Sequence, residues 1–485
     1  MIESDRENES HEIDKMDTRG QQAWRGHPHR YPILLVILIG IFMFVVDAVV
    51  VSVALPTITT HFHASVALAQ WIITAYLISI TSLLLICGRI SEYIGRPRMF
   101  LAGIILFTLS SLGCGISSCL SMLILFRILQ AAGGAMAFSI SAAMIFQTFP
   151  KGELGRAMGY IGSTIAAGSI AGPVLGGYVV DLLGWQYIFL INVPIGIALL
   201  LLAMRYLKID EKRLERLEMD WIGAGTIILF MAALMLLLSE LAIRMSVGIR
   251  TIAYTVIFVG SFLAFITNER RQRRPLLDPS VFADLRFTLP GISMMLFFVC
   301  NFMMVIAGPF FLQGVMKLSP SQVGTIYLIV PTIVVIGSPL AGWLYDRYHY
   351  KYHAAIGMLI TATAFLLMGY TSRRMDLFHY ILAYLPLGIG SSLFQSPNNA
   401  EIMSALPPEK LGMASSLTAT IRNLGMALGT SASGILVSWQ LSQAGYFGPI
   451  LQADPELLSA TISNIIFIAG AICALGAVAS MMRNH

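Results

Sequence analysis

Residues 46–56 read VDAVVVSVALP, which places one acid, Asp47, in the outer half of an otherwise apolar segment. A carboxylate at the centre of a bilayer costs about 2.5–3.5 kcal/mol on insertion scales. A group that costs this much is kept only if it is neutral, paired with another group or used in function.

The composition of the chain is that of an integral membrane protein. Of its 485 residues, 56% are hydrophobic and 12% are charged, and the mean hydropathy is +0.76. Soluble globular proteins carry about 25% charged residues. The five cysteines form no CxxC or Cys/His cluster, so we expect them to pack among apolar side chains, and we expect neither a metal nor a cofactor.

A membrane span needs roughly 20 apolar residues. Fourteen candidate segments lie at 32–56, 68–89, 99–118, 121–147, 156–183, 187–204, 221–240, 250–267, 287–312, 322–344, 354–370, 379–403, 411–437 and 460–482. We therefore predict an all-α polytopic membrane protein with fourteen spans. Residues 1–31 are polar, mixed in charge and without a signal-peptide pattern, which predicts a disordered cytoplasmic tail.

The basic residues predict the orientation of the chain. With the N-terminus in the cytoplasm, cytoplasmic segments hold 24 of the 31 lysines and arginines, and external loops hold five. The opposite orientation would reverse this bias. We therefore expect a multi-pass protein of the plasma membrane with both termini in the cytoplasm.

The sequence also contains an internal repeat. Gly168 and Gly172 recur 257 residues later as Gly425 and Gly429, and the segment 88–92 has a counterpart at 342–346. The repeat predicts an N-terminal six-helix bundle over 32–204, linkers with two extra central helices over 205–286, and a C-terminal six-helix bundle over 287–485. Two parallel halves around a midplane site are an architecture of secondary transporters.

The segment GRISEYIGRPRMF, residues 88–100, joins the second and third spans on the predicted cytoplasmic side. Its glycines allow a tight turn and close helix approach, and its acid has basic neighbours. A positive-inside loop would explain the arginines alone, whereas a gating latch also explains the glycines and the acid. The predicted gating loop comprises Gly88, Glu92, Gly95 and Arg96, with Asp346 and Arg347 at the corresponding place in the second half.

Arg127 lies within the fourth span, in RILQAAGGA. Because a guanidinium stays charged in proteins, this side chain either faces a polar interior or reaches the headgroups near the outer end of its span. In the first case it is a buried cation that influences the protonation of a nearby acid.

Glycines recur at i, i+4 and i+8 in the fifth span, within GSIAGPVLGGY. Such a stripe admits another helix at close range. It serves either ordinary packing or, in the functional interpretation, as a pivot between the two halves. The residues concerned are Gly168, Gly172 and Gly176, with Pro173 and Gly177 beside them.

Polar side chains within the later spans are candidates for the lining of a substrate cavity. They are Asn301, Gln313, Gln395 and Asn398. Arg422, in the thirteenth span, has two equally weighted interpretations: a cap for backbone carbonyls or a contact to substrate.

Several of these motifs resemble signatures of the major facilitator superfamily. Residues 88–96 are similar to its loop signature, with Glu92 for the usual Asp, and Arg127-x-x-Gln130-x-x-Gly133 resembles its fourth-span signature. The glycine stripe resembles an antiporter signature of exporters. The stretches 47–56, Trp71-x-x-Thr74-x-Tyr76 and WQYIFLINVPIG at 185–196 resemble the fourteen-span drug:proton antiporters of EmrB/QacA type.

The resemblance implies the major facilitator fold and proton-driven export by alternating access. It assigns proton coupling to Asp47 and Arg127, and it adds Trp71 and Tyr76 to the candidate cavity residues.

We therefore expect a proton-coupled antiporter that exports amphipathic or cationic small molecules, as in multidrug efflux. The alternative is the same fold exporting a specific endogenous metabolite, lipid or amino acid, and a third hypothesis is a receptor or channel that transports nothing. No GxxxxGKS/T, HExxH or GxSxG motif points to an enzyme. The expected partners are protons, a small-molecule substrate and the bilayer, with no nucleic acid, and we expect a monomer.

Overall fold

The computed structural model describes residues 27–150, 153–209, 220–244, 248–272, 279–348, 352–405, 411–446 and 448–482. Within these ranges the secondary structure is helical, without a β-strand. Helices satisfy their own backbone hydrogen bonds, which is the requirement for crossing hydrocarbon. The predicted tail over 1–31 lies largely outside the described residues, and its last two residues already belong to the first long helix.

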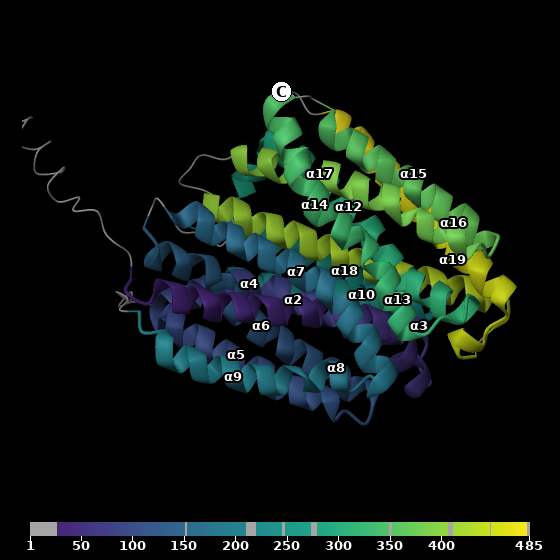
Figure 1. The fold of residues 1–485 in the computed structure, drawn as a ribbon, viewed down its shortest axis with the longest axis horizontal. Helices are drawn as coiled ribbons and strands as arrows, with labels where there is room; N and C mark the ends of the chain where they lie inside the picture. Colours follow the sequence, from purple (N-terminus) through teal and green to yellow (C-terminus); the bar gives the residue numbers. More distant parts are fainter. Residues whose placement is uncertain are drawn as a thin grey trace, which may run out of the picture.

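The N-terminal helices form one body, drawn from purple to teal in Figure 1. They are α2 (Arg30–His61), α3 (Val66–Ala69), α4 (Trp71–Ile94), α5 (Arg96–Gly115), α6 (Leu120–Thr148), α7 (Leu154–Leu182), α8 (Tyr187–Leu190) and α9 (Asn192–Tyr206). The short loop predicted between the third and fourth spans is present, because α5 ends four residues before Cys119 caps α6.

The C-terminal helices form a second body, drawn in green to yellow (Figure 1). They are η2 (Pro279–Ala283), α12 (Leu285–Phe310), η3 (Phe311–Val315), α13 (Pro320–Tyr327), α14 (Ile329–Tyr348), α15 (His353–Arg373), α16 (Leu377–Leu382), α17 (Tyr384–Ser404), α18 (Leu411–Gln443), η5 (Ile450–Gln452) and α19 (Pro455–Met481).

Thirteen helical stretches in the described part of the chain are long and apolar enough to cross a membrane. The remaining predicted span, 411–437, lies in α18, a helix of 33 residues that is not among the thirteen. Serine, threonine and glycine are frequent along α18 and lower its hydropathy. The count of fourteen spans is therefore not confirmed, although a long helix is present at each predicted place.

The two bodies pack their helices in the same pattern. In the first, α2 packs on α7 and α5 on α6; in the second, α12 packs on α18 and α15 on α17. A Cβ atom at Gly103 would lie 2.7 Å from the carbonyl oxygen of Gly133, and one at Gly357 would lie 2.8 Å from that of Gly390. Because real Cβ atoms do not approach this closely, both halves need glycine at the same helix crossing.

Two extra helices, α10 (Trp221–Arg244) and α11 (Ile249–Glu269), form a hairpin. Helix α10 contacts α4 of the first half and α18 of the second. A single buried apolar cluster joins three helices: it contains Ile86 of α4, Ile227 of α10 and Met294 of α12. The hairpin therefore covers one seam between the two halves.

The halves also meet directly at the end of the bundle where α13 begins. The Ser321 amide donates to Asp181 Oδ2 at 2.9 Å, and Gln313 Nε2 donates to the Val53 carbonyl at 3.0 Å. On the seam that the hairpin covers, between α4 and α18, the hydroxyl oxygens of Thr74 and Ser431 lie 3.4 Å apart. These contacts hold this end of the bundle closed.

The glycine crossing predicts a position-specific loss of stability. Gly103→Ala should destabilise the protein by about 1–3 kcal/mol, because the added methyl overpacks the backbone contact with Gly133. Gly225→Ala is the matched control, because a Cβ there meets no atom within 4 Å. Thermal unfolding of the purified proteins in one detergent measures the difference, and equal melting temperatures would contradict the packing described here.

Candidate functional site

Asp47 lies near the middle of α2, and both its side chain and that of Arg127 are 0% exposed. Arg127 on α6 donates from Nη1 to Asp47 Oδ2 at 2.6 Å. The acid and the cation that the sequence singled out are therefore direct partners in the interior of the N-terminal half. Arg127 is not at the headgroups, so the snorkelling interpretation is wrong.

The second carboxylate oxygen of Asp47 has its own donors. Gln130 Nε2 donates to Oδ1 at 3.0 Å, and Asn192 Nδ2 donates to the same atom at 2.8 Å. Gln130 follows Arg127 by three residues, which puts both side chains on one face of α6. Asn192 comes from the first turn of α9. Two helices, α6 and α9, thus supply the three side chains that surround the carboxylate.

Arg127 is also held from α4 and α8. Its Nε donates to the Ile72 carbonyl at 3.1 Å, and its guanidinium carbon lies 4.0 Å from the ring centroid of Tyr76 and 5.7 Å from that of Phe189. Arg127 Nη2 has no hydrogen-bond partner in the described ranges. Cation–π interactions with these two rings stabilise the guanidinium where it makes no hydrogen bond.

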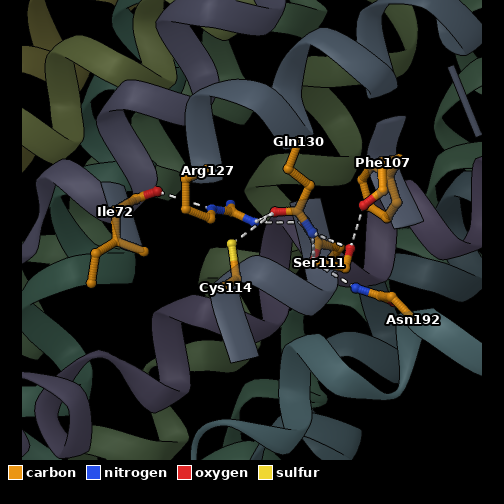
Figure 2. Close-up of polar contacts among 8 residues, drawn as sticks. Ile72, Phe107, Ser111, Cys114, Arg127, Gln130 and Asn192 are labelled. Atoms are coloured by element: carbon orange, nitrogen blue, oxygen red, sulfur yellow. Dashed lines mark hydrogen bonds and ion pairs between the residues drawn. The ribbon is translucent and has the colours of Figure 1, made fainter. Parts of the chain in front are cut away.

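Gln130 extends the network to α5. Its Oε1 accepts from Arg127 Nη1 at 2.7 Å, its Nε2 also donates to Ser111 Oγ at 2.7 Å, and Ser111 donates to the Phe107 carbonyl at 2.7 Å. Figure 2 shows this chain of contacts running from the Ile72 carbonyl through Arg127 and Gln130 to Ser111. Protonation or loss of one member therefore changes the hydrogen bonding of several helices.

Three members of this site were not predicted from the sequence: Gln130, Asn192 and Ser111. Gln130 was visible as the third residue after Arg127, and Asn192 as an amide interrupting an apolar span. Ser111 gave no signal, because serine in a membrane helix usually bonds to its own backbone. The charged pair was predictable because a charge within an apolar span is energetically costly. Its neutral hydrogen-bond donors can be identified only once the packing of the helices is known.

The glycine stripe packs on α2, within the same half. Cβ atoms at Gly168 and Gly172 would lie 3.0 Å and 3.2 Å from the Cβ atoms of Val45 and Val49. The three glycines of the stripe therefore pack within the first half and do not themselves form the contact between the halves. Gly177, on another face of α7, meets the second half, because a Cβ there would lie 2.9 Å from the Ser321 Cα. Pro173 also meets that half, because its carbonyl oxygen lies directly against the backbone of Gly324.

The predicted gating loop is shorter than expected. Helix α4 continues through Gly88 and Glu92 to Ile94, Gly95 adopts a φ of 98°, and Arg96 already begins α5. Glu92 pairs with Arg89 on its own helix.

The counterpart of this loop in the second half is only partly described. The side chain of Asp346 lies outside the described residues. Arg347 is exposed, with its guanidinium over the rings of Trp343 and Tyr348.

The candidate cavity residues are dispersed. Tyr76 belongs to the Arg127 site, and Trp71 is buried at the start of α4. Asn301 donates to the Phe297 carbonyl on its own helix, Asn398 to the Pro290 carbonyl and Gln313 to the Val53 carbonyl. Gln395 and Arg422 are half-buried. The structure does not bring the C-terminal members of this set to Asp47.

The buried ion pair predicts a non-additive effect on stability. Arg127→Gln alone should cost about 3–5 kcal/mol, because it leaves the Asp47 carboxylate buried without its cation. Asp47→Asn combined with Arg127→Gln should regain most of this loss, since a neutral pair of similar volume avoids the uncompensated charge. Detergent melting curves of the single and double variants measure the coupling, and strictly additive losses would contradict the pairing.

Known proteins resemble this chain along most of its length. The uncharacterized transporter YebQ of Escherichia coli is 34% identical, with 90% of this chain and 94% of that protein covered. The riboflavin transporter RibZ of Clostridioides difficile is 29% identical, covering 92% and 96%. The multidrug export protein EmrB of E. coli is 30% identical, covering 80% and 77%.

A solved structure shares the fold. The bacterial homologue of the human lysosomal transporter Spinster, in an inward-facing and unoccupied conformation, superposes with a TM-score of 0.69 at 16% identity, covering 94% of this chain and 97% of that one. The family model described as Major Facilitator Superfamily matches residues 37–430. The chain is therefore a multi-pass membrane protein with the all-helical major facilitator fold, and it belongs to the major facilitator superfamily of transporters.

Proposed function

We propose that this transporter is a proton-coupled antiporter that exports amphipathic or cationic small molecules by alternating access, with Asp47 as the residue that binds the proton. The observation that carries the proposal is the Asp47–Arg127 ion pair, 2.6 Å long and sealed from solvent. A buried carboxylate with a fixed cation has two electrostatically distinct states, ionised and protonated, and proton coupling requires such a pair of states.

The pair is connected to the contacts that close the bundle at the α13 end. Asp47 is on α2, whose Val53 carbonyl accepts from Gln313 of the second half. Arg127 holds the Ile72 carbonyl on α4, two residues before Thr74, which meets Ser431 of the second half. Protonation of Asp47 removes the charge that holds Arg127, so it alters both helices that carry contacts between the halves.

The relatives support an export function in part. EmrB is named for multidrug export, whereas RibZ is named for riboflavin transport. We propose the drug-exporter class, and a specific metabolite as the second candidate. In either case we propose a monomer in the plasma membrane with cytoplasmic termini, divided into bundles over 32–204 and 287–485 with 205–286 between them. The residues of the gating loop and the dispersed polar residues are proposed to serve gating and substrate contact.

Replacing the proton-binding residue should uncouple transport. In proteoliposomes, a one-proton antiporter should sustain about a tenfold ethidium gradient for each unit of imposed pH difference, because one pH unit corresponds to about 1.4 kcal/mol. Asp47→Asn should sustain none, because an amide cannot bind and release the proton, although the variant should still bind ethidium. Glu456→Gln, an exposed acid at the start of α19, is the control and should behave as wild type.

Three outcomes distinguish the hypotheses. Gradient-driven ethidium export that persists in Asp47→Asn would contradict the role of Asp47. Transport of riboflavin with no transport of ethidium or a second dye by the wild type would favour the metabolite exporter. Absence of any flux under a gradient, in protein that is folded and reconstituted, would favour the receptor or channel hypothesis.

A bulky residue at the contact between α7 and α13 should hold the bundle open at that end. Gly177→Leu places side-chain atoms where Ser321 of the second half lies, since even a Cβ would be 2.9 Å from the Ser321 Cα. Transport should fall, and a cysteine introduced at Thr74 should become labelled by a membrane-impermeant thiol reagent added to the α13 side. Gly225→Leu, where there is open space, is the control. The labelling requires Cys119→Ser to remove the exposed native thiol.

A further inference from the structure

A groove runs along the outside of the C-terminal half, in a different half from Asp47. It consists of two hollows of about 300 Å³ and 370 Å³ that share Leu344 and Leu393. Helix α14 forms one wall and α17 the other, and the start of α15 closes one end. The small residues Gly337 and Ala341 of α14 line the groove, and at Gly337 the helix packs closely on Ser392 of α17.

The long part of the groove is apolar and faces the surroundings of the protein. Leu340 is 63% exposed and Ile389 is 49% exposed, on opposite walls. In a membrane protein, exposed apolar side chains of a spanning helix meet lipid tails. An elongated, apolar hollow between two such helices has the shape and polarity of an acyl chain.

The end of the groove at α15 contains a buried polar side chain. His353 lines the second hollow and is 6% exposed, yet its Nε2 has no hydrogen-bond partner among the described residues. The Tyr345 ring lies edge-on to the His353 ring at 6.3 Å and limits its movement. A buried donor or acceptor without a partner is unfavourable, so a ligand atom at this place would satisfy it.

Two further features at this end favour an anion. His353 is the first residue of α15, whose N-cap residue Tyr352 makes no side-chain capping bond, and a helix N-terminus attracts negative charge. The guanidinium carbon of Arg347 lies 5.5 Å from the Trp343 ring and 5.8 Å from the Tyr348 ring. Trp343 lines the first hollow and Tyr348 the second, so the stacked guanidinium is held beside the groove.

We propose that this groove binds an anionic phospholipid. One acyl chain lies between α14 and α17, and the phosphate accepts hydrogen bonds at His353, at the N-terminus of α15 and from Arg347. Basic pockets between membrane helices are known to select lipid headgroups in this way. This site is separate from the ion pair, and it does not depend on the identity of the transported substrate.

Lipid binding to the purified transporter tests the proposal. Native mass spectrometry in detergent should show phosphatidylglycerol retained more strongly than phosphatidylcholine of the same chains. Arg347→Gln should weaken retention of phosphatidylglycerol about fivefold, the factor one basic side chain contributes at an anionic surface. His353→Phe should weaken it as well, and phosphatidylcholine should be little affected by either change.

The controls separate the headgroup from the acyl chain. Arg374→Gln removes an arginine that is likewise stacked on a tyrosine, Tyr370, at the far end of α15, and it should leave retention unchanged. Leu340→Trp fills the groove at an exposed position and should reduce retention of phosphatidylglycerol without unfolding the protein. Glycerol phosphate, which has no acyl chain, should not compete.

Other results would overturn the site. Equal retention of the two lipids by the wild type would remove the anionic preference. Equal losses in Arg347→Gln and Arg374→Gln would show general surface attraction, and competition by glycerol phosphate would indicate an anion site without an acyl groove. Undiminished retention in Leu340→Trp would place the lipid elsewhere.

Discussion

An ion pair sealed from water inside the N-terminal half constrains the whole structure. Neither Asp47 nor Arg127 has access to solvent, so every favourable interaction of either charge must come from the protein. Five other helices each contribute a carbonyl, a hydroxyl, an amide or an aromatic face to the pair or to its direct partners. They are α4, α5, α6, α8 and α9. The positions of these helices relative to α2 are therefore fixed by electrostatics as well as by apolar packing.

The sequence predicted the charged members of this site and little of its neutral part. Asp47 and Arg127 were conspicuous because charge in an apolar helix is costly. The contact between them depends on how α2 and α6 are rotated, which no single-sequence pattern specifies. The same limitation applies to the glycine stripe. Its spacing correctly predicted a close helix neighbour, but the neighbour is α2 and not the other half.

The fold itself was largely predictable, since apolar segments locate the long helices and a repeated motif indicates two similar halves. The weak point was α18, which is rich in serine and threonine and is not among the thirteen stretches apolar enough to cross a membrane. The polar residues of the C-terminal spans do not form one group in the structure. Asn301 and Asn398 bond to backbone carbonyls within their own half, which is what an amide in an apolar helix bundle does when no charge is near.

The two halves share their backbone packing but differ in chemistry. Gly133 and Gly390 make equivalent crossings, and the residue six positions before each is Arg127 in the first half and Tyr384 in the second. Tyr384 lies among Tyr327 and Tyr380, with ring centroids about 6 Å apart. The first half thus places a charge where the second places an aromatic cluster.

The α10–α11 hairpin adds a mechanical difference between the seams, because α10 touches both α4 and α18. Any rocking that separates those two helices must therefore also break contacts of α10 with at least one of them, which makes opening of this seam more costly than its direct contacts alone would.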